Sequence, residues 1–88
     1  MSLQEQFQSA QQRVRALSKT PPPAKLLEIY ALYKQGTVGD VQGKRPGMLD
    51  VKGRAKYDAW AATKGLSPDT AMRRYVELVD ALVTSERS

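Results

Sequence analysis

The sequence contains no cysteine and no histidine. The chain therefore has no disulfide, no thiolate nucleophile, no imidazole base and none of the usual zinc ligands. Aspartates and glutamates are present, but no pair of them lies in an apolar setting that would suggest acid–base catalysis. We therefore expect a protein that is not an enzyme and that uses neither a metal nor a cofactor.

Long hydrophobic runs are also absent, whereas a membrane-spanning helix needs about 20 apolar residues in succession. Residues 1–5 lack the basic and apolar regions of a signal peptide. These absences, with the missing cysteines, predict a cytoplasmic protein. The 88 residues, 41% of them hydrophobic, fit a single domain over residues 1–88 with one modest core.

The positive charge of the chain is concentrated in one segment. The net charge is +5, and residues 44–56 carry +4 of it, from five basic residues and one acidic residue, Asp50. A patch of this kind favours an anionic ligand. The basic residues of this segment are Lys44, Arg45, Lys52, Arg54 and Lys56.

Apolar residues recur at helical spacing in four segments, and no segment shows the alternation of a strand. Packing four amphipathic helices together gives an all-α four-helix bundle. The connection at residues 37–50 contains several glycines and a proline, and long connections in small domains are often functional. The expected helices span about residues 3–17, 22–35, 51–64 and 68–85.

Residues that favour helix ends support these boundaries. Ser2 is expected to begin the first helix with a capping box, Pro23 to open the second, and Asp50 to cap the third. Gly36 and Gly65 are expected to end the second and third helices.

The core is predicted from the apolar faces of the helices. We also expect Met48, Leu49 and Trp60 to pack in the core and to anchor the long connection. The other predicted core residues are Phe7, Val14, Leu17, Met72, Val79 and Leu82.

Tyr30, Tyr33 and Lys34 share one helical face, since they are spaced i, i+3 and i+4. A lysine can bind a phosphate and a flat ring can stack on a base, so this face could hold a phosphorylated nucleotide. The tyrosines could equally pack at the edge of the core, and Lys56 could lie on a solvated helix face. A basic helical module that binds nucleic acid is an alternative, suggested by a pI of about 9.8.

Three ordered motifs resemble those of the acyl-CoA-binding protein family. They are YALYKQGTVGD at residues 30–40, RPGMLD at 45–50 and KGRAKYDAW at 52–60. The segment AMRRY at 71–75 is similar to that family as well, and the resemblance covers nearly the whole chain. It implies an up-down-down-up four-helix bundle that binds acyl-CoA thioesters in a shallow bowl.

The resemblance also implies roles for individual residues. Tyr30, Lys34 and Lys56 would hold the 3′-phosphate of the ribose, and Tyr33 would stack on the adenine. The other implied contacts are Tyr75 along the ligand, Arg15 near a phosphate, Leu26 and Leu27 at the acyl chain, and Ala55 near the nucleotide and the chain.

The implied function is that of a non-catalytic intracellular carrier that buffers and transports medium- to long-chain fatty acyl-CoA. Such a carrier would act as a monomer, deliver its ligand to acyl-CoA-using enzymes, touch membranes transiently and bind no nucleic acid. Gln11 stands where the family commonly has a small residue, so the preferred chain length stays open. Whether Lys52 and Arg54 contact the ligand is also open.

Overall fold

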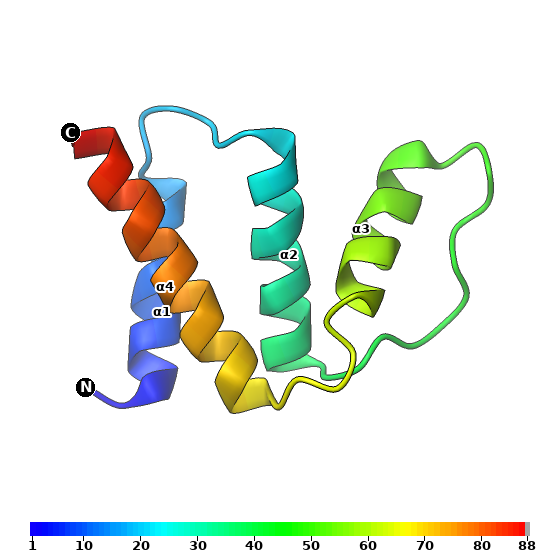
Figure 1. Cartoon of the computed structure of the whole chain (residues 1–88), viewed down its shortest axis with the longest axis horizontal. Coiled ribbons are helices and arrows are strands. Elements are labelled where there is room, and N and C mark those ends of the chain that lie inside the picture. The colour runs from blue at the N-terminus through cyan, green and yellow to red at the C-terminus, as the bar shows by residue number, and fades with distance from the viewer. Residues whose placement is uncertain (88) are drawn as a thin grey trace.

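Four α-helices make up the computed structural model of the chain, which describes residues 1–87. Figure 1 shows α1 running up, α2 and α3 running down, and α4 running up, so the predicted up-down-down-up topology is confirmed. No residue in the described range 1–87 forms a strand, as predicted. The helices are α1 (Leu3–Arg15), α2 (Pro23–Thr37), α3 (Val51–Ala61) and α4 (Pro68–Arg87).

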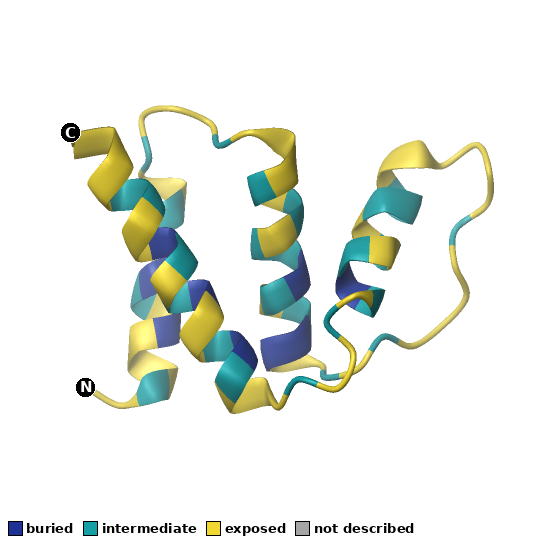
Figure 2. Cartoon of the chain, viewed as in Figure 1, coloured by how far each residue is buried: buried dark blue, intermediate teal, exposed yellow. Residues whose placement is uncertain are grey.

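The helices pack in the spatial order α1, α4, α2, α3. The innermost cluster consists of Phe7 and Ala10 of α1 with Tyr75 and Val79 of α4. Figure 2 shows buried residues on each of the four helices, with the fewest on α3. Among the described residues, α3 packs on α2 alone, so its position depends on that single helix contact and on the connections at its two ends.

The predicted residues at the helix starts are confirmed. The Ser2 hydroxyl accepts a hydrogen bond from the Glu5 amide, and the Glu5 carboxylate accepts one from the Ser2 amide. Pro23 is the first residue of α2, where its missing N–H leaves no bond unmade. Asp50 caps α3 by accepting a hydrogen bond from the Gly53 amide at 2.9 Å.

The C-terminal ends of the helices differ from the predicted positions by two or three residues. Gly36 does not end α2: it is buried inside the helix, where an added Cβ would lie 3.2 Å from the Met72 side chain. The glycine serves the close approach of α4, and Gly39, with φ of 97°, follows the true helix end. At α3, the helix stops at Ala61, and a tight turn then leads to Gly65, whose φ is 95°.

Seven of the nine residues predicted to form the core are buried or partly buried. Phe7, Val79 and Trp60 are buried, as predicted. The Trp60 Nε1 donates a hydrogen bond to the Gly39 carbonyl at 2.7 Å, so this ring does anchor the long connection. Four further predicted core residues are only partly buried: Val14, Leu17, Met72 and Leu82.

The prediction that Met48 and Leu49 pack in the core is wrong. Their side chains are 80% and 100% exposed. The connection is held on α3 by polar contacts instead, in which Arg45 pairs with Asp58 at 2.7 and 2.8 Å. Met48 and Leu49 lie after these contacts, in the turn that leads into α3, and their side chains extend into solvent.

Gln35 was not singled out by the sequence, yet it is buried with 1% of its surface exposed. Its Nε2 donates hydrogen bonds to Asp40 Oδ1 and to the Leu66 carbonyl, both at 2.8 Å. The Thr63 hydroxyl donates to Gln35 Oε1 at 3.0 Å. One side chain on α2 therefore fixes the start of the long connection and the turn after α3.

Asp40 completes this polar network. Its Oδ1 also accepts a hydrogen bond from the Gly65 amide at 2.9 Å. The Gly65 amide, followed by the Gln35 side chain, holds the pKa of the Asp40 carboxyl below its usual value. Asp40 is therefore charged at neutral pH and joins both connections of α3.

Candidate ligand-binding site

A trough follows one face of α2 and consists of two adjoining hollows that share Leu26 and Tyr30. The first hollow, of about 380 Å³, lies among α1, α2 and α4. The second, of about 300 Å³, lies between α2 and α3. The first is further lined by Gln11, Val14, Arg15, Ile29, Tyr33 and Tyr75. The second is further lined by Pro23, Leu27, Lys52, Ala55 and Lys56.

Eight of the nine predicted ligand-contact residues line this trough. They come from all four helices, although the sequence separates them by up to 60 positions, from Arg15 to Tyr75. The fold brings these eight residues together on one surface. Their contact with a ligand remains a prediction. The eight are Arg15, Leu26, Leu27, Tyr30, Tyr33, Ala55, Lys56 and Tyr75.

Lys34 is the predicted residue that lines neither hollow. Its Nζ lies 4.8 Å from the centre of the Trp60 ring. The Nζ of Lys56 lies in a similar way 5.4 Å from the centre of the Tyr30 ring. In the second contact, the residue from α2 and the residue from α3 each lie four positions earlier in the sequence than in the first contact. The two contacts are therefore one helical turn apart on parallel helices. Of the three residues predicted to hold the phosphate, Lys34 therefore lies one helical turn away from Tyr30 and Lys56.

Tyr33 presents a supported aromatic surface to the first hollow. The Phe7 ring lies 6.0 Å from the Tyr33 ring at an interplanar angle of 26°, which is a stacked arrangement. Phe7 itself contacts the Tyr75 ring edge-on at 4.9 Å and is buried in the core. Tyr33 remains 38% exposed. Its ring is thus held in place by the core and is available for stacking with another flat ring.

Tyr75 lines the first hollow although its side chain is almost fully buried. Burial raises the pKa of its hydroxyl, while the nearby Arg15 has a smaller opposing effect. The hydroxyl therefore stays protonated at neutral pH and can donate a hydrogen bond to a ligand.

The second hollow combines apolar walls with positive charge. Pro23, Leu27 and Ala55 supply hydrocarbon surface, and the exposed Lys52 and Lys56 supply two cations. An amphiphilic ligand fits such walls, because a chain can bury its methylenes while an anionic group meets the lysines.

Several lining residues were not assigned from the sequence. Ile29 fell among the apolar residues of its helix, and Lys52 was left open. The signal was present in the spacing, since Leu26, Ile29, Tyr30 and Tyr33 share one helical face. Arg54, also left open, lines neither hollow.

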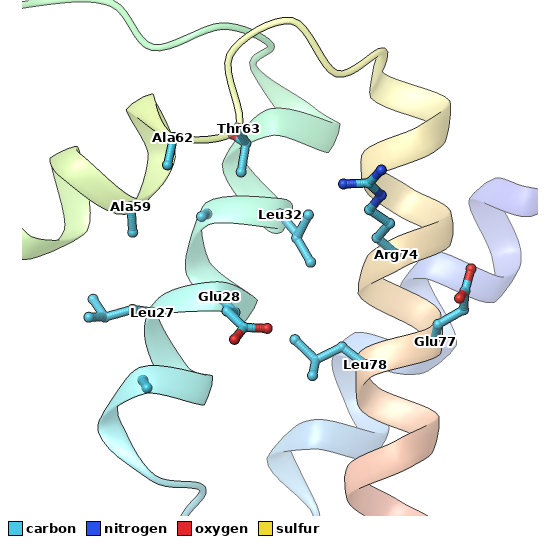
Figure 3. A pocket seen from close by; sticks show the side chains of 11 residues that line it. Leu27, Glu28, Leu32, Ala59, Ala62, Thr63, Arg74, Glu77 and Leu78 are labelled. Carbon is cyan, nitrogen blue, oxygen red and sulfur yellow. The ribbon is translucent and has the colours of Figure 1, made fainter.

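A larger hollow, of about 420 Å³, lies on the opposite face of α2, between α3 and α4. Figure 3 shows Leu32 and Leu78 pointing toward each other across it, with Glu28 nearby. The carboxylates of Glu28 and Glu77 and the guanidinium of Arg74 line it, and no aromatic ring does. Its size exceeds that of either hollow of the trough, but its two carboxylates outnumber its one cation, which disfavours an anionic ligand.

The fold is a small all-α bundle, and its trough brings apolar walls, aromatic rings and lysines together. A family model described as "Acyl CoA binding protein" matches residues 4–79. The chain belongs to the acyl-CoA-binding protein family, which confirms the resemblance predicted from its motifs. This is a family of binding proteins.

Individual relatives match over nearly their whole length. An acyl-CoA-binding protein homolog of Manduca sexta is 49% identical over 86 residues, which cover 97% of this chain and 96% of that protein. An acyl-CoA-binding protein of Brassica napus is 46% identical over 88 residues, covering 100% of this chain and 96% of that protein.

The fold agrees with solved structures as well. The crystal structure of Oryza sativa Acyl-CoA-Binding Protein 2 superposes with a TM-score of 0.93 at 38% identity, covering 98% of this chain and 94% of that one. The predicted all-α fold of this family is thereby confirmed. None of these matches supports the nucleic-acid-binding alternative.

Proposed function

We propose that this protein is a non-catalytic carrier that binds medium- to long-chain fatty acyl-CoA thioesters in the trough along α2. It would buffer the free concentration of these esters and transport them. The observation that carries this proposal is the gathering of eight predicted contact residues from four helices into one trough.

The nucleotide end of the ligand would lie where α2 and α3 bring Tyr30 and Lys56 together. A phosphate monoester carries nearly two negative charges at neutral pH. A charge-assisted hydrogen bond to it is stronger than the contact of an exposed lysine with a ring face. Lys56 and Lys34 would therefore leave their aromatic partners for the 3′-phosphate, with the Tyr30 hydroxyl as a further donor.

The adenine would stack on Tyr33, whose ring is already held by Phe7. Because this ring needs no reordering, less conformational entropy is lost on binding. Arg15, which lines the same hollow, would assist with phosphate charge, and Tyr75 would line the ligand from α4.

The acyl chain would occupy the second hollow against Leu26, Leu27 and Ala55. Each buried methylene contributes about 0.8 kcal/mol to binding. A chain of which half is buried therefore adds several kcal/mol, enough to separate acyl-CoA from CoA. The head would provide specificity and the chain much of the affinity.

The proposal includes a cytoplasmic, monomeric protein that delivers its ligand to acyl-CoA-using enzymes, contacts membranes transiently and binds no nucleic acid. No helix within residues 1–87 has both the length and the apolar character needed to cross a membrane. A carrier without a catalytic step agrees with the composition, because without cysteine and histidine the common nucleophile–base pairs cannot form.

Thermal unfolding tests this proposal, since a ligand that binds only the native state stabilises it. A sixteen-carbon acyl-CoA at a hundredfold excess over its Kd adds about 2.7 kcal/mol to the free energy of unfolding. For a domain of this size we expect the Tm to rise by about 10 °C or more. Bare CoA at the same concentration should raise it less. An unchanged Tm with the acyl-CoA would contradict the proposal.

A further inference from the structure

Met48, Leu49 and Val51 form an exposed apolar tip at the start of α3. Their side chains are 80%, 100% and 72% exposed. Figure 2 shows that the start of α3 and the end of the preceding connection are exposed together. Single exposed apolar residues are common, but a cluster of large ones marks an interaction surface.

The apolar tip is not explained by the packing of the fold. The connection that carries it is fixed by the Arg45–Asp58 pair and by the Tyr57 hydroxyl, which donates to the Gly43 carbonyl at 3.0 Å. These contacts are polar and need neither Met48 nor Leu49. The two side chains also line none of the hollows described above.

The charge around the apolar tip is positive. Lys44 precedes it and Lys52 follows it directly, and both residues are exposed. Arg45 and Asp58 neutralise each other, and Asp50 caps α3. With the exposed Lys56 one turn further on, cations border the apolar tip along the chain on both sides. Apolar residues bordered by lysines are the composition of surfaces that bind anionic lipid bilayers.

The apolar tip also adjoins the mouth of the second hollow. Val51 belongs to it and the next residue, Lys52, lines that hollow. Leu26, which lines the hollow from α2, is itself 42% exposed. An acyl chain leaving a bilayer at the apolar tip would therefore meet the hollow at once, with little of its hydrocarbon exposed to water.

We propose that the apolar tip docks on membranes rich in anionic phospholipids and loads the acyl chain into the second hollow from the bilayer. Met48, Leu49 and Val51 insert at the headgroup level, and Lys44 and Lys52 meet lipid phosphates. This inference rests on the proposed acyl-CoA-binding function, and it assigns to that function a docking surface and a direction of entry.

Co-sedimentation with vesicles tests the docking step. Wild-type protein should bind vesicles of phosphatidylcholine with phosphatidylserine, bind pure phosphatidylcholine weakly, and dissociate as salt is raised. The double variant Met48→Ser/Leu49→Ser should bind the anionic vesicles about tenfold more weakly. Lys44→Ala should weaken binding about fivefold. Val38→Ser, which removes an exposed apolar side chain elsewhere, should bind like wild type. Equal binding by the wild type and the double variant would overturn the proposal, as would equal binding to neutral vesicles.

The rate of acyl-CoA transfer separates this inference from the proposed function. The double variant should keep the Tm and the affinity for acyl-CoA in vesicle-free buffer, because both replaced side chains are exposed and line neither hollow of the trough. It should take up acyl-CoA from anionic vesicles several-fold more slowly than wild type. If the double variant and the wild type took up acyl-CoA at equal rates and with equal affinity, membrane loading would be refuted and the proposed function would stand. No acyl-CoA binding by the wild type would refute the proposed function itself.

Discussion

Replacing Lys56 with alanine is expected to weaken the binding of CoA and of acyl-CoA by the same amount. The amine lies in the trough, 5.4 Å from the centre of the Tyr30 ring, and is proposed to bind the 3′-phosphate common to both ligands. A lost hydrogen bond to a charged group costs about 1.5–3 kcal/mol. Titration calorimetry of wild type and Lys56→Ala with each ligand measures this loss.

Lys44→Ala is the matched control for the Lys56 prediction. It removes the same charge from the same basic segment, but Lys44 lines neither hollow of the trough. Its effect on the binding of free CoA should be small, because an exposed charge acts only through screened, long-range attraction. If Lys56→Ala bound CoA as tightly as Lys44→Ala does, the phosphate site would lie elsewhere.

Replacing Gln35 with alanine is expected to lower the free energy of unfolding by about 2–4 kcal/mol, because this buried side chain is lost together with its hydrogen bonds to partly buried groups. The Leu66 carbonyl would lose a donor, and the Thr63 hydroxyl would keep the Trp60 carbonyl as its acceptor. For a domain of this size, the Tm should fall by about 10 °C or more. Chemical and thermal unfolding of the variant measure both quantities.

Two further variants isolate the cause of the Gln35 effect. Gln12→Ala removes an exposed glutamine from α1 and should change stability little. Gln35→Leu keeps most of the side-chain volume, so its loss of stability reports the hydrogen bonds and not a cavity. Full stability of Gln35→Leu would show that the polar network does not hold α3 in place.

The Gln35 network also bears on the ligand site. α3 packs on α2 alone among the described residues, and α3 carries Ala55 and Lys56 of the second hollow. Loosening the turn after α3 would move these residues relative to Tyr30. We therefore expect Gln35→Ala to weaken acyl-CoA binding as well, although Gln35 lines neither hollow of the trough.

The helices could be predicted from the sequence because their starts depend on local chemistry. The Ser2 capping box, Pro23 and the Asp50 cap each satisfy backbone groups within a few residues. The end of α2 could not be predicted in this way. Glycine is a residue type that often ends helices, but Gly36 lies inside α2, where Met72 of α4 approaches it closely. That contact is not local in the sequence.

The same distinction explains Met48, Leu49 and Gln35. Hydrophobic residues in a small domain are ordinarily buried, and a glutamine ordinarily is not. In this protein, polar contacts of Arg45, Tyr57 and Gln35 fix the long connection, so hydrophobic side chains are not needed there. Whether polar contacts or hydrophobic packing fix a loop depends on the tertiary partners of that loop. Helical periodicity in the sequence does not identify these partners.

The candidate site could be predicted in greater detail than the long connection, because the family motifs indicate which individual residues contact the ligand. Helical spacing placed Tyr30 and Tyr33 on one face, and the resemblance brought residues of the other three helices to them. The position of Lys34 beside Trp60 was not predicted. A lysine has several rotatable bonds, so its partner depends on which aromatic ring or anion is nearest.

The most direct test of the two-ended site is a calorimetric titration with a sixteen-carbon acyl-CoA, with CoA and with the free fatty acid. We expect one acyl-CoA per protein, bound far more tightly than either fragment, because the proposed sites for the head and the chain lie on one face of α2. If CoA alone bound as tightly as acyl-CoA, the second hollow would not hold the chain. If none of the three ligands bound, the trough would not be an acyl-CoA site.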